Sequence, residues 1–358
     1  VQPLVLPGWP ARLEASETVR PRVIALDTAS RQDSPEEAAQ KTREACAAAQ
    51  RLGAQVVYKK IDSTMRGNVG PEALAAAQAL GLEGALVCPA FPEQGRTVTG
   101  GRLFVRGEPV HEALGRDSVP TPAPEADLLA CLGRAAQTES ALLPLATTCA
   151  GEEEIAQALQ GHAAEAIGIV VADAETREHL NSLALALLRP EIHWLPVGSA
   201  GLARSLATRL LGRQQPFRLR LSRPGEVVLA SGSLADLTRR QVAAAVRAGV
   251  VSRLAIAART SGLAAEFVRA ERTDLAALFI VGGETARCVL HALGIEALWA
   301  LGEMVSGVAV LRVADGPHKG MTIVTKGGNI GDEATLVTCL RRLRSLATRR
   351  GSAGAAQD

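Results

Sequence analysis

Three stretches of the N-terminal half place arginine or lysine beside hydroxyl and carboxylate groups, each directly after a predicted strand. They are residues 27–31, residues 59–68 and residues 91–97. A guanidinium group binds a carboxylate through two parallel hydrogen bonds, so this combination suits a small molecule that carries one carboxylate and several hydroxyls. The candidate binding residues are Asp27, Arg31, Lys60, Ser63, Arg66 and Arg96.

A single arginine in such a stretch is as often part of a surface ion pair as of a binding site. For Arg66 the alternative is specific, because it could pair with Asp62 and brace the turn between them. Asp62 is also the candidate catalytic residue, since its carboxylate could orient or deprotonate a substrate hydroxyl. The two interpretations of Arg66 differ in what its loss would damage, substrate affinity in one case and thermal stability in the other.

Three glycine-rich turns of the C-terminal half form a second group, and each follows a predicted strand. They are residues 231–233, residues 282–285 and residues 325–331. Glycine allows backbone N–H groups to approach a ligand closely, and the N-terminus of a following helix favours an anion. Lys326 would add a positive charge to a phosphate site. The candidate binding residues are Ser231, Gly282, Gly283, Glu284, Thr285, Lys326, Gly328 and Gly331.

Any one of these turns, taken alone, is more often structural than functional. Three of them in one domain indicate a ligand site, because ligands of open parallel sheets collect at the carboxyl ends of the strands. None matches Gly-x-x-x-x-Gly-Lys-Ser/Thr or Gly-x-Gly-x-x-Gly. The sequence therefore supports neither a P-loop nor a dinucleotide-binding fingerprint, and a nicotinamide-dependent oxidoreductase is the least favoured function.

Strands and helices alternate along the chain, which predicts an α/β fold built from parallel βαβ units. The first helix has a strong start signal, with Ser34 as N-cap, Pro35 at the first helical position and Glu37 completing a capping box. Further helices are expected from Pro71 and from about Asp332. The main predicted strands are residues 23–26, 56–58, 85–88, 167–171, 194–198, 227–230, 278–281, 308–313 and 322–325.

Residues 214–225, which are rich in proline, glycine and charge, separate two runs of this alternation. They predict two domains, residues 1–215 and residues 224–358. Each is expected to hold a largely parallel sheet flanked by helices, with a ligand cleft between the two domains. Residues 94–125 indicate loops or short hairpins within the first domain.

Composition excludes several other classes of protein. The 358 residues are 47% hydrophobic, 21% charged and only 3% aromatic, with a net charge of +2, and no basic block marks a nucleic-acid surface. The six cysteines form no Cys-x-x-Cys pair, which is typical of a reduced cytoplasmic protein. No apolar run is long enough to cross a membrane. We expect small-molecule ligands and neither nucleic-acid nor membrane partners.

The residues that carry a family resemblance start with the run from Tyr58 to Gly70, which contains Lys60-Ile61-Asp62-Ser63-Thr64-Met65-Arg66-Gly67-Asn68. It resembles the hallmark of the four-carbon acid sugar kinase family. Four later segments occur in the family's order, and the resemblance extends over nearly the whole chain. They are residues 88–97, 198–203, 282–286 and 325–333.

The resemblance implies a kinase that uses ATP, with Mg²⁺ bridging the phosphates, to phosphorylate the terminal hydroxyl of threonate, erythronate or a 3-oxo-tetronate. It also implies that the N-terminal domain binds the sugar acid and the C-terminal domain binds the nucleotide. The arginine-rich stretches and the glycine-rich turns divide between the two halves in the same way.

The sequence departs from the family at its start. Members usually open with a strand followed by Asp-Asp-x-Thr-Gly-Ala, and residues 1–6 match the second strand instead. An aspartate of that segment would be a natural base, so we expect the chain as written to turn over slowly. The alternative function is a catalytically impaired or non-catalytic binding protein of the same fold. An exposed sheet edge left by a missing strand would favour a homo-oligomer.

Overall fold

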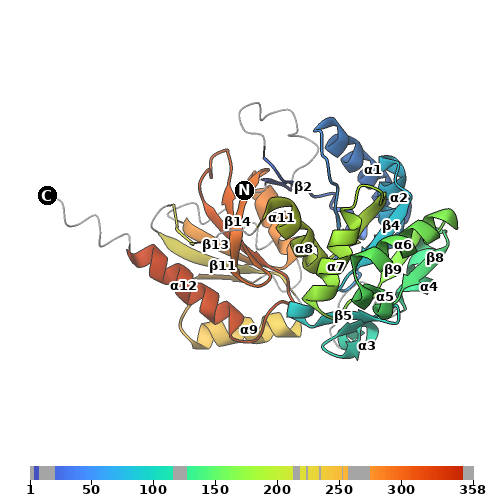
Figure 1. Ribbon diagram of the computed structural model, residues 1–358. Coiled ribbons are helices and arrows are strands. Elements are labelled where there is room, and N and C mark those ends of the chain that lie inside the picture. The colour runs from blue at the N-terminus through green and yellow to red at the C-terminus, as the bar shows by residue number, and fades with distance from the viewer. Residues whose placement is uncertain are drawn as a thin grey trace. The chain divides into compact units, whose positions relative to one another are not determined.

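The computed structural model describes residues 4–7, 21–115, 127–212, 218–222, 225–233, 235–251, 253–256 and 275–349. Two compact units make up the structure (Figure 1). Thr28–Gln214 forms one, here called the middle unit. The residues up to Asp27, together with those from Gln215 onward, form the other, here called the flanking unit.

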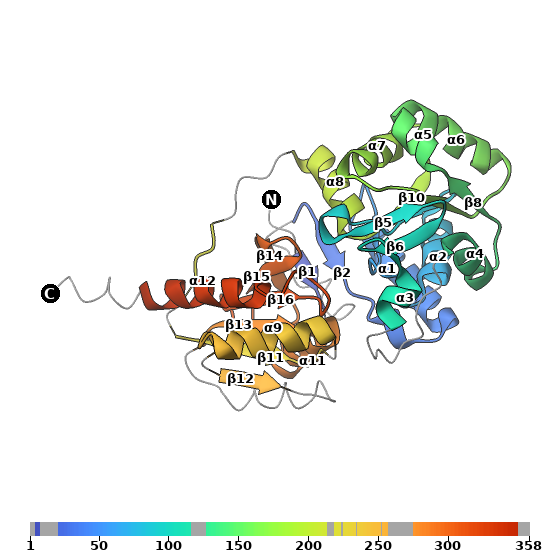
Figure 2. The same cartoon turned by 90° about the horizontal axis from the view of Figure 1, so that it is seen from below.

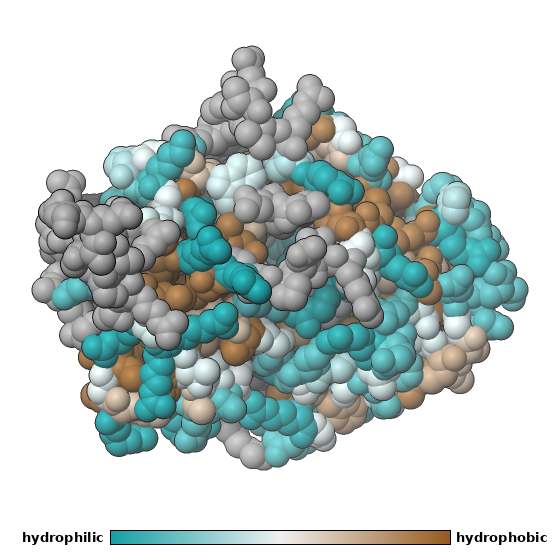
Figure 3. All heavy atoms as spheres, turned by 60° about the vertical axis from the view of Figure 1, so that its left-hand side comes forward, coloured by the Kyte–Doolittle hydropathy of each residue, from teal (hydrophilic) through white to brown (hydrophobic). Residues whose placement is uncertain are grey.

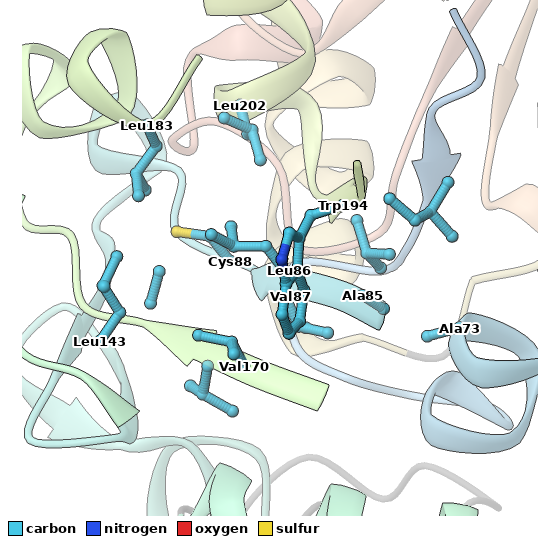
Figure 4. Packing of buried hydrophobic residues seen from close by; sticks show 14 of the residues in the cluster. Ala73, Ala85, Leu86, Val87, Cys88, Leu143, Val170, Leu183, Trp194 and Leu202 are labelled. Carbon is cyan, nitrogen blue, oxygen red and sulfur yellow. The ribbon is translucent and has the colours of Figure 1, made fainter. Parts of the chain in front are cut away.

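The described part of the middle unit contains a five-stranded parallel sheet in the order β3-β10-β4-β9-β8. All side chains of β4 and β10 are buried, which is the pattern of strands covered on both faces. Figure 4 shows Leu183, Leu202 and Ala73, from three different helices, packed around β4. The strands are β3 (Lys59–Lys60), β4 (Gly84–Cys88), β8 (Ser140–Leu143), β9 (Ile169–Ala172) and β10 (Trp194–Gly198).

Seven α-helices of the described middle unit pack on this sheet or on one another. They are α1 (Pro35–Arg51), α2 (Val69–Leu80), α4 (Leu128–Ala136), α5 (Leu145–Ala150), α6 (Glu152–Ala164), α7 (Arg177–Leu187) and α8 (Ala200–Leu211). The predicted capping box of α1 is confirmed, because the Ser34 hydroxyl accepts from the Glu37 N–H and the Glu37 carboxylate accepts from the Ser34 N–H. Gly81 ends α2 in the left-handed conformation that glycine favours.

A small antiparallel sheet occupies part of the predicted excursion. It contains β5 (Arg96–Thr99), β6 (Arg102–Val105) and β7 (Glu108–Pro109), and α3 (Val110–Gly115) follows it. The buried carboxylate of Asp173 accepts hydrogen bonds from the N–H groups of Gly100 and Gly101 at 2.8 and 2.9 Å, and so fixes the β5–β6 turn. Residues 116–126 of the predicted excursion lie outside the described residues.

The described part of the flanking unit contains an eight-stranded sheet in the order β12-β11-β13-β16-β15-β14-β1-β2. The first four strands in this order are parallel, and β15 and β14 run antiparallel to their neighbours. The strands are β1 (Leu4–Leu6), β2 (Ile24–Leu26), β11 (Glu226–Ser231), β12 (Arg253–Ile256), β13 (Leu275–Val281), β14 (Leu298–Val305), β15 (Val308–Val313) and β16 (Thr322–Lys326).

Helices α9 (Asp236–Arg247) and α12 (Thr335–Arg349) lie side by side on one face of this sheet (Figure 2). Helix α11 (Gly283–Ala292) packs into a different apolar cluster, with Val289 and Leu290 against β-strand residues that point to the other face. Each of these helices begins shortly after the carboxyl end of a strand. The predicted fold class, α/β with helices flanking largely parallel sheets, is confirmed.

The first two strands of the chain belong to a different unit from the domain in which the sequence placed them. β1 pairs antiparallel with β14, with Leu4 opposite Trp299, and parallel with β2. The residues up to Asp27 therefore belong to the flanking unit, whereas the sequence placed them in a domain of residues 1–215. Local patterns cannot show this pairing, because the partner strand lies near the other end of the chain. Residues 214–217 and 223–224 of the predicted linker lie outside the described residues.

Three element boundaries also shift. Residues 56–58 were predicted as a strand, but the strand forms at Lys59–Lys60 and the Val56 side chain is 43% exposed. The reason is register, because only the last two residues of β10 reach this edge strand. Helix α2 begins two residues before Pro71, which lies in the first turn, where no backbone N–H is needed. Helix α12 begins at Thr335 rather than at Asp332.

Among the described residues, every helix is too short or too polar to span a membrane. Figure 3 shows hydrophilic side chains interspersed with apolar ones on one face of the molecule. The large apolar side chains that the described surface exposes are scattered over several elements. They are Leu52, Val56, Leu210, Val246 and Val305.

Candidate functional site

The three glycine-rich turns of the flanking unit lie together because β11, β13 and β16 are neighbouring parallel strands. Ser231 ends β11, Val281 pairs with Lys326 at the end of β16, and the Gly282 N–H donates to the Lys326 carbonyl at 2.9 Å. All three turns therefore leave the sheet at the same edge. This is the edge at which ligands of open α/β sheets bind.

Backbone atoms approach one another closely where the turns meet. A Cβ atom at Gly328 would lie 2.3 Å from the Ser233 hydroxyl oxygen, and a Cβ atom at Gly282 would lie 3.5 Å from the Ser233 Cβ. Gly282 also has φ of 107°, which side chains disfavour. The Ser233 side chain thus lies next to the second and third turns. Glycine is favoured at Gly328 by the close Ser233 hydroxyl and at Gly282 by its positive φ.

Two helix N-termini at this edge have no side-chain cap. The N-cap of α9 is Ala235 and that of α11 is Gly282, and neither provides a side-chain hydrogen bond to the first helical N–H groups. Gly283 has no atom within 4 Å of the position that a Cβ would take, so its surroundings are open. Uncapped N–H groups at the positive end of a helix dipole attract an anion such as a phosphate.

Lys326 is the charged group of this edge. Its side chain is buried, with 4% exposure, and its ammonium donates to the carbonyls of Gly327 and Gly328 at 2.8 and 3.4 Å. Within the described residues it has no carboxylate partner. Burial lowers the pKa of Lys326 to about 8. A buried ammonium without a counter-ion is costly, and an anionic ligand would compensate it.

The other predicted residues of this group have different surroundings. Ser231 and Thr285 are buried, while Glu284 is exposed and pairs with Arg287 on the same helix at 2.5 Å. Gly331 has φ of 82°, and a Cβ there would lie 2.3 Å from the Thr335 hydroxyl oxygen. Gly331 therefore forms the tight turn before α12, whereas the Glu284 side chain is part of a surface ion pair.

In the middle unit, Asp62 and Arg66 form an ion pair after β3. Arg66 Nε lies 2.5 Å from Asp62 Oδ2, and the Thr64 hydroxyl donates to the same oxygen at 2.8 Å. Burial would raise the pKa of the Asp62 carboxyl, but the charge and hydrogen bond of Arg66, helped by Arg31 and Thr64, hold it at about 2. The alternative interpretation of Arg66 as a brace of the turn therefore matches a contact that the structure contains.

Positive charges surround this single carboxylate. Arg31 and Arg96 both interact electrostatically with Asp62. Arg96 is buried, and burial together with the neighbouring charges of Arg106 and Arg66 lowers its pKa to about 10, although Asp62 opposes the shift. This part of the middle unit carries more cationic than anionic groups, and so suits an anionic ligand.

Lys60 adds a further cation, and its exposed side chain donates to the Ile61 carbonyl at 2.7 Å. The surrounding protein atoms lower the pKa of Lys60, and Arg31 and Lys59 add to this effect although Asp62 opposes it. Because its charged form is disfavoured in the free protein, the Lys60 ammonium would be stabilised by a bound anion.

The loop that carries Arg31 is held by helix α2. Asn68 donates to the carbonyls of Ser30 and Asp33 at 3.2 and 2.9 Å. The buried Glu72 carboxylate accepts from the Ser30 hydroxyl at 2.7 Å and forms an ion pair with Lys59. These contacts fix the position of Arg31 relative to the Asp62 turn, because Asn68 and Glu72 follow that turn directly.

Asp27 follows β2 directly, at the limit between the two units. It lies in the flanking unit and interacts electrostatically with Arg287. Ser63 is half-buried and makes no hydrogen bond within the described part of the chain. Glu72 and Ser233 were not among the predicted site residues. Glu72 looks like an ordinary residue of an Ala-rich helix, and nothing in the turn of residues 231–233 distinguishes Ser233 from Ser231.

A divalent metal has a limited set of protein ligands here. Among the described residues, no group of three His, Cys, Asp or Glu side chains could hold a metal ion. Mg²⁺ in kinases needs only one or two carboxylates, because the phosphates and water supply its other ligands. The exposed Asp332, at the end of the third turn, is a carboxylate that fits this requirement.

Two family models match the chain. A sugar-binding N-terminal domain matches residues 6–206, and a nucleotide-binding C-terminal domain matches residues 227–336. The first model covers more than half of the chain and contains the cationic turn after β3. The second contains all three glycine-rich turns in full and the start of α12.

Several curated proteins are similar over most of their length. A D-threonate kinase of Cupriavidus necator is 34% identical over 88% of this chain and 86% of its own. A 3-oxo-tetronate kinase of Methylobacterium radiotolerans is 31% identical over 86% of each chain. A D-erythronate kinase of Heliobacterium modesticaldum is 25% identical over 89% of this chain and 86% of its own.

Solved structures share the fold at lower identity. A Haemophilus influenzae protein superposes with a TM-score of 0.72 at 21% identity, covering 95% of this chain and 94% of its own. A Salmonella typhimurium protein gives a TM-score of 0.75 at 23% identity, covering 96% and 93%. These likenesses concern the arrangement of strands and helices.

Proposed function

Because the chain belongs to the four-carbon acid sugar kinase family, we propose that it transfers the γ-phosphate of ATP to the terminal hydroxyl of a four-carbon acid sugar. The substrate class is threonate, erythronate or a 3-oxo-tetronate, as in the named relatives. The partners are then two small molecules. A cytoplasmic location and a homo-oligomeric state stay predictions.

The observation that carries this proposal is the buried Lys326 at the meeting point of three glycine-rich turns. Its ammonium lies among backbone carbonyls without a carboxylate partner in the described chain. Phosphoryl transfer depends on neutralising the charge of the phosphates and aligning them, more than on covalent chemistry by the protein. Lys326 supplies charge, and the N-termini of α9 and α11 supply oriented N–H groups.

The cationic cluster after β3 is the proposed site for the sugar acid. Arg31, Lys60 and Arg96 would bind the substrate carboxylate, and Ser63 would hydrogen-bond a hydroxyl. Arg66 would contribute through its guanidinium while it stays paired with Asp62. Transfer requires this group and the nucleotide to face each other across the cleft that the sequence predicts.

We assign Asp62 an orienting role in this reaction. A carboxylate with a pKa of about 2 is a weak base, and one of its oxygens already accepts from Arg66 and Thr64. A loose transition state places little demand on early deprotonation of the attacking hydroxyl. Orientation of Arg66 and of the hydroxyl is therefore the role that the geometry supports best.

Mg²⁺ would neutralise charge on the β- and γ-phosphates. Asp332 is the candidate protein ligand, since its Oδ1 accepts from the Thr335 hydroxyl at 2.7 Å and its carboxylate stays exposed. That hydrogen bond also lowers the pKa of Asp332, so the carboxylate is ionised at neutral pH. The phosphates and water would supply the remaining ligands.

A coupled assay for ADP tests the proposal. The purified chain is incubated with ATP, MgCl₂ and, in separate reactions, D-threonate, D-erythronate or a 3-oxo-tetronate. We expect ADP to form with at least one acid, at a rate far above that with ATP alone. Binding of ATP and acid in calorimetry without ADP formation would overturn the proposal and support the non-catalytic alternative.

A further inference from the structure

Helix α9 contacts the third glycine-rich turn through two buried side chains. The Thr238 hydroxyl donates to the Gly328 carbonyl at 2.9 Å and lies 3.1 Å from the Ser233 hydroxyl oxygen. One turn further along α9, Gln241 Nε2 donates to the carbonyls of Ile330 and Asp332 at 3.1 and 2.5 Å. Both side chains are at most 1% exposed.

These contacts fix the direction of three peptide groups. In a trans peptide the C=O of one residue and the N–H of the next point in opposite directions. Because α9 binds the carbonyls of residues 328, 330 and 332, the N–H groups of residues 329, 331 and 333 point away from α9. The Gly328 carbonyl also accepts from the Lys326 ammonium at 3.4 Å, so α9 and Lys326 together fix the backbone of the third turn.

Burial of the Gln241 amide costs free energy, which the hydrogen bonds donated by its Nε2 group must offset. Its Oε1 atom is buried and accepts no hydrogen bond within the described residues. An unmet buried acceptor destabilises a fold, and an apolar side chain of the same size would avoid the cost. The amide is therefore explained by what its Nε2 holds, which is the backbone of the third turn.

We propose that Gln241 and Thr238 are positioning residues for the phosphates of ATP, an inference that rests on the nucleotide-binding function proposed above. Neither needs to touch the nucleotide. Thr238 connects the first and third turns, and Gln241 fixes the backbone of the third turn beyond Lys326. Without them the turn could rotate its peptide groups and present carbonyls to the phosphates.

The main variant is Gln241→Met, which keeps the volume of the side chain and removes the donor. We expect KM for ATP to rise about tenfold, in line with two lost hydrogen bonds, and KM for the sugar acid to change less than twofold. The rise in melting temperature caused by saturating ATP should shrink accordingly, while the melting temperature without ATP changes little.

Conservative and matched variants separate positioning from stability. Thr238→Ser keeps the hydroxyl and should retain wild-type KM for ATP, whereas Thr238→Val should raise it. Thr322→Val is the matched control, because Thr322 is a buried threonine at the opposite end of β16 from Lys326, and its hydroxyl makes no hydrogen bond within the described residues. It should leave both KM values and the ATP-induced shift unchanged.

Three results decide the inference. A selective rise in KM for ATP in Gln241→Met and Thr238→Val, with rescue by Thr238→Ser, supports it. An unchanged KM for ATP in folded Gln241→Met overturns it, as does an equal change of KM for both substrates. If the wild-type chain binds no ATP, the proposed function itself fails, and this result is recognised before any variant is made.

Discussion

The two units approach the binding of an anion in different ways. In the flanking unit the candidate site consists of glycine backbone, helix N-termini and one buried ammonium, that of Lys326. In the middle unit it consists of charged side chains, with the Asp62–Arg66 ion pair among further cations. The first arrangement suits a polyphosphate, whose oxygens accept hydrogen bonds from many N–H groups. The second suits a single planar carboxylate.

This difference implies different sensitivities. A backbone site depends on glycine conformation, on the helices behind the turns and on the single charge of Lys326. A site of paired side chains depends on each charge and on pH. The predictions below test whether the two units respond to substitution independently, from the largest expected effect to the smallest.

Replacing Lys326 with Met should have the largest effect. The variant removes the cationic side chain assigned to the phosphate site, and a charge-assisted hydrogen bond is worth about 1.5–3 kcal/mol, so kcat/KM for ATP should fall about 100-fold. The free energy of unfolding should stay unchanged or increase, because the buried ammonium is no longer desolvated. Steady-state kinetics and urea denaturation measure the two quantities. A large loss of stability would mean that Lys326 is structural.

Arg66→Ala should weaken sugar-acid binding about ten- to hundredfold and leave KM for ATP within twofold. It should also lower thermal stability, because Asp62 then stays buried without its ion pair. The Asp62 pKa of about 2 lies below its ordinary value, so its stabilising contribution is present above about pH 4 and is lost as pH falls toward 2.

Melting temperatures between pH 7 and pH 3 check the second part of that prediction. In the variant, the loss of stability on acidification should be smaller than in wild type, because without Arg66 the Asp62 pKa is no longer held far below its ordinary value. A variant that loses stability but binds the sugar acid normally would leave Arg66 with the bracing role alone.

Gly283→Asp should weaken ATP binding about tenfold through repulsion of the phosphates, with sugar-acid affinity unchanged. The position is open and starts α11, where an acidic residue usually stabilises a helix, so the fold should not suffer. Gly283→Asn is the matched control of equal size without the charge, and it should bind ATP nearly as wild type does. Calorimetric titration of ATP into both variants tests the charge effect.

ATP affinity should decline between pH 7 and pH 9 by roughly tenfold, because Lys326 has a pKa of about 8 in the free protein and binds phosphate only when protonated. Lys326→Met should lack this decline. The lowered pKa also means that Lys326 opposes folding below about pH 8, and that this opposition disappears as pH rises toward the ordinary lysine value. The stability difference between wild type and Lys326→Met should therefore narrow over this range.

Asp62→Asn should have the smallest effect on turnover. With Asp62 in an orienting role, kcat should fall less than tenfold, and KM for the sugar acid should rise because Arg66 loses its fixed position. General-base assistance is worth about 10²–10⁴-fold, so a larger drop in kcat would restore Asp62 as the base. A plot of kcat against pH distinguishes the two roles.

Local signals in the sequence predicted much of the fold. The capping box at Ser34 and the buried strand at residues 85–88 were confirmed, because each depends on residues that are close in the chain. The pairing of β1 with β14 could not be predicted in this way. It depends on a strand from the far end of the chain, and it places the residues up to Asp27 in the flanking unit.

The candidate site was predicted unevenly for a similar reason. Glycine turns at strand ends have a signal of their own, and neighbouring parallel strands then bring them together. The supports behind them, Thr238 and Gln241 of α9, have no such signal, because a buried threonine and glutamine look like ordinary helix residues. Likewise, the sequence offered both a pair of Asp62 with Arg66 and a role for Asp62 as a base, and no local pattern decides between them.

The most direct test of the two-site account is calorimetric titration of ATP and of the sugar acid, separately, into Lys326→Met and Arg66→Ala. The account predicts that Lys326→Met loses affinity for ATP alone and that Arg66→Ala loses affinity for the sugar acid alone. If either variant loses both ligands while folded, or if Lys326→Met binds ATP as wild type does, the assignment of the two ligands to the two units is contradicted.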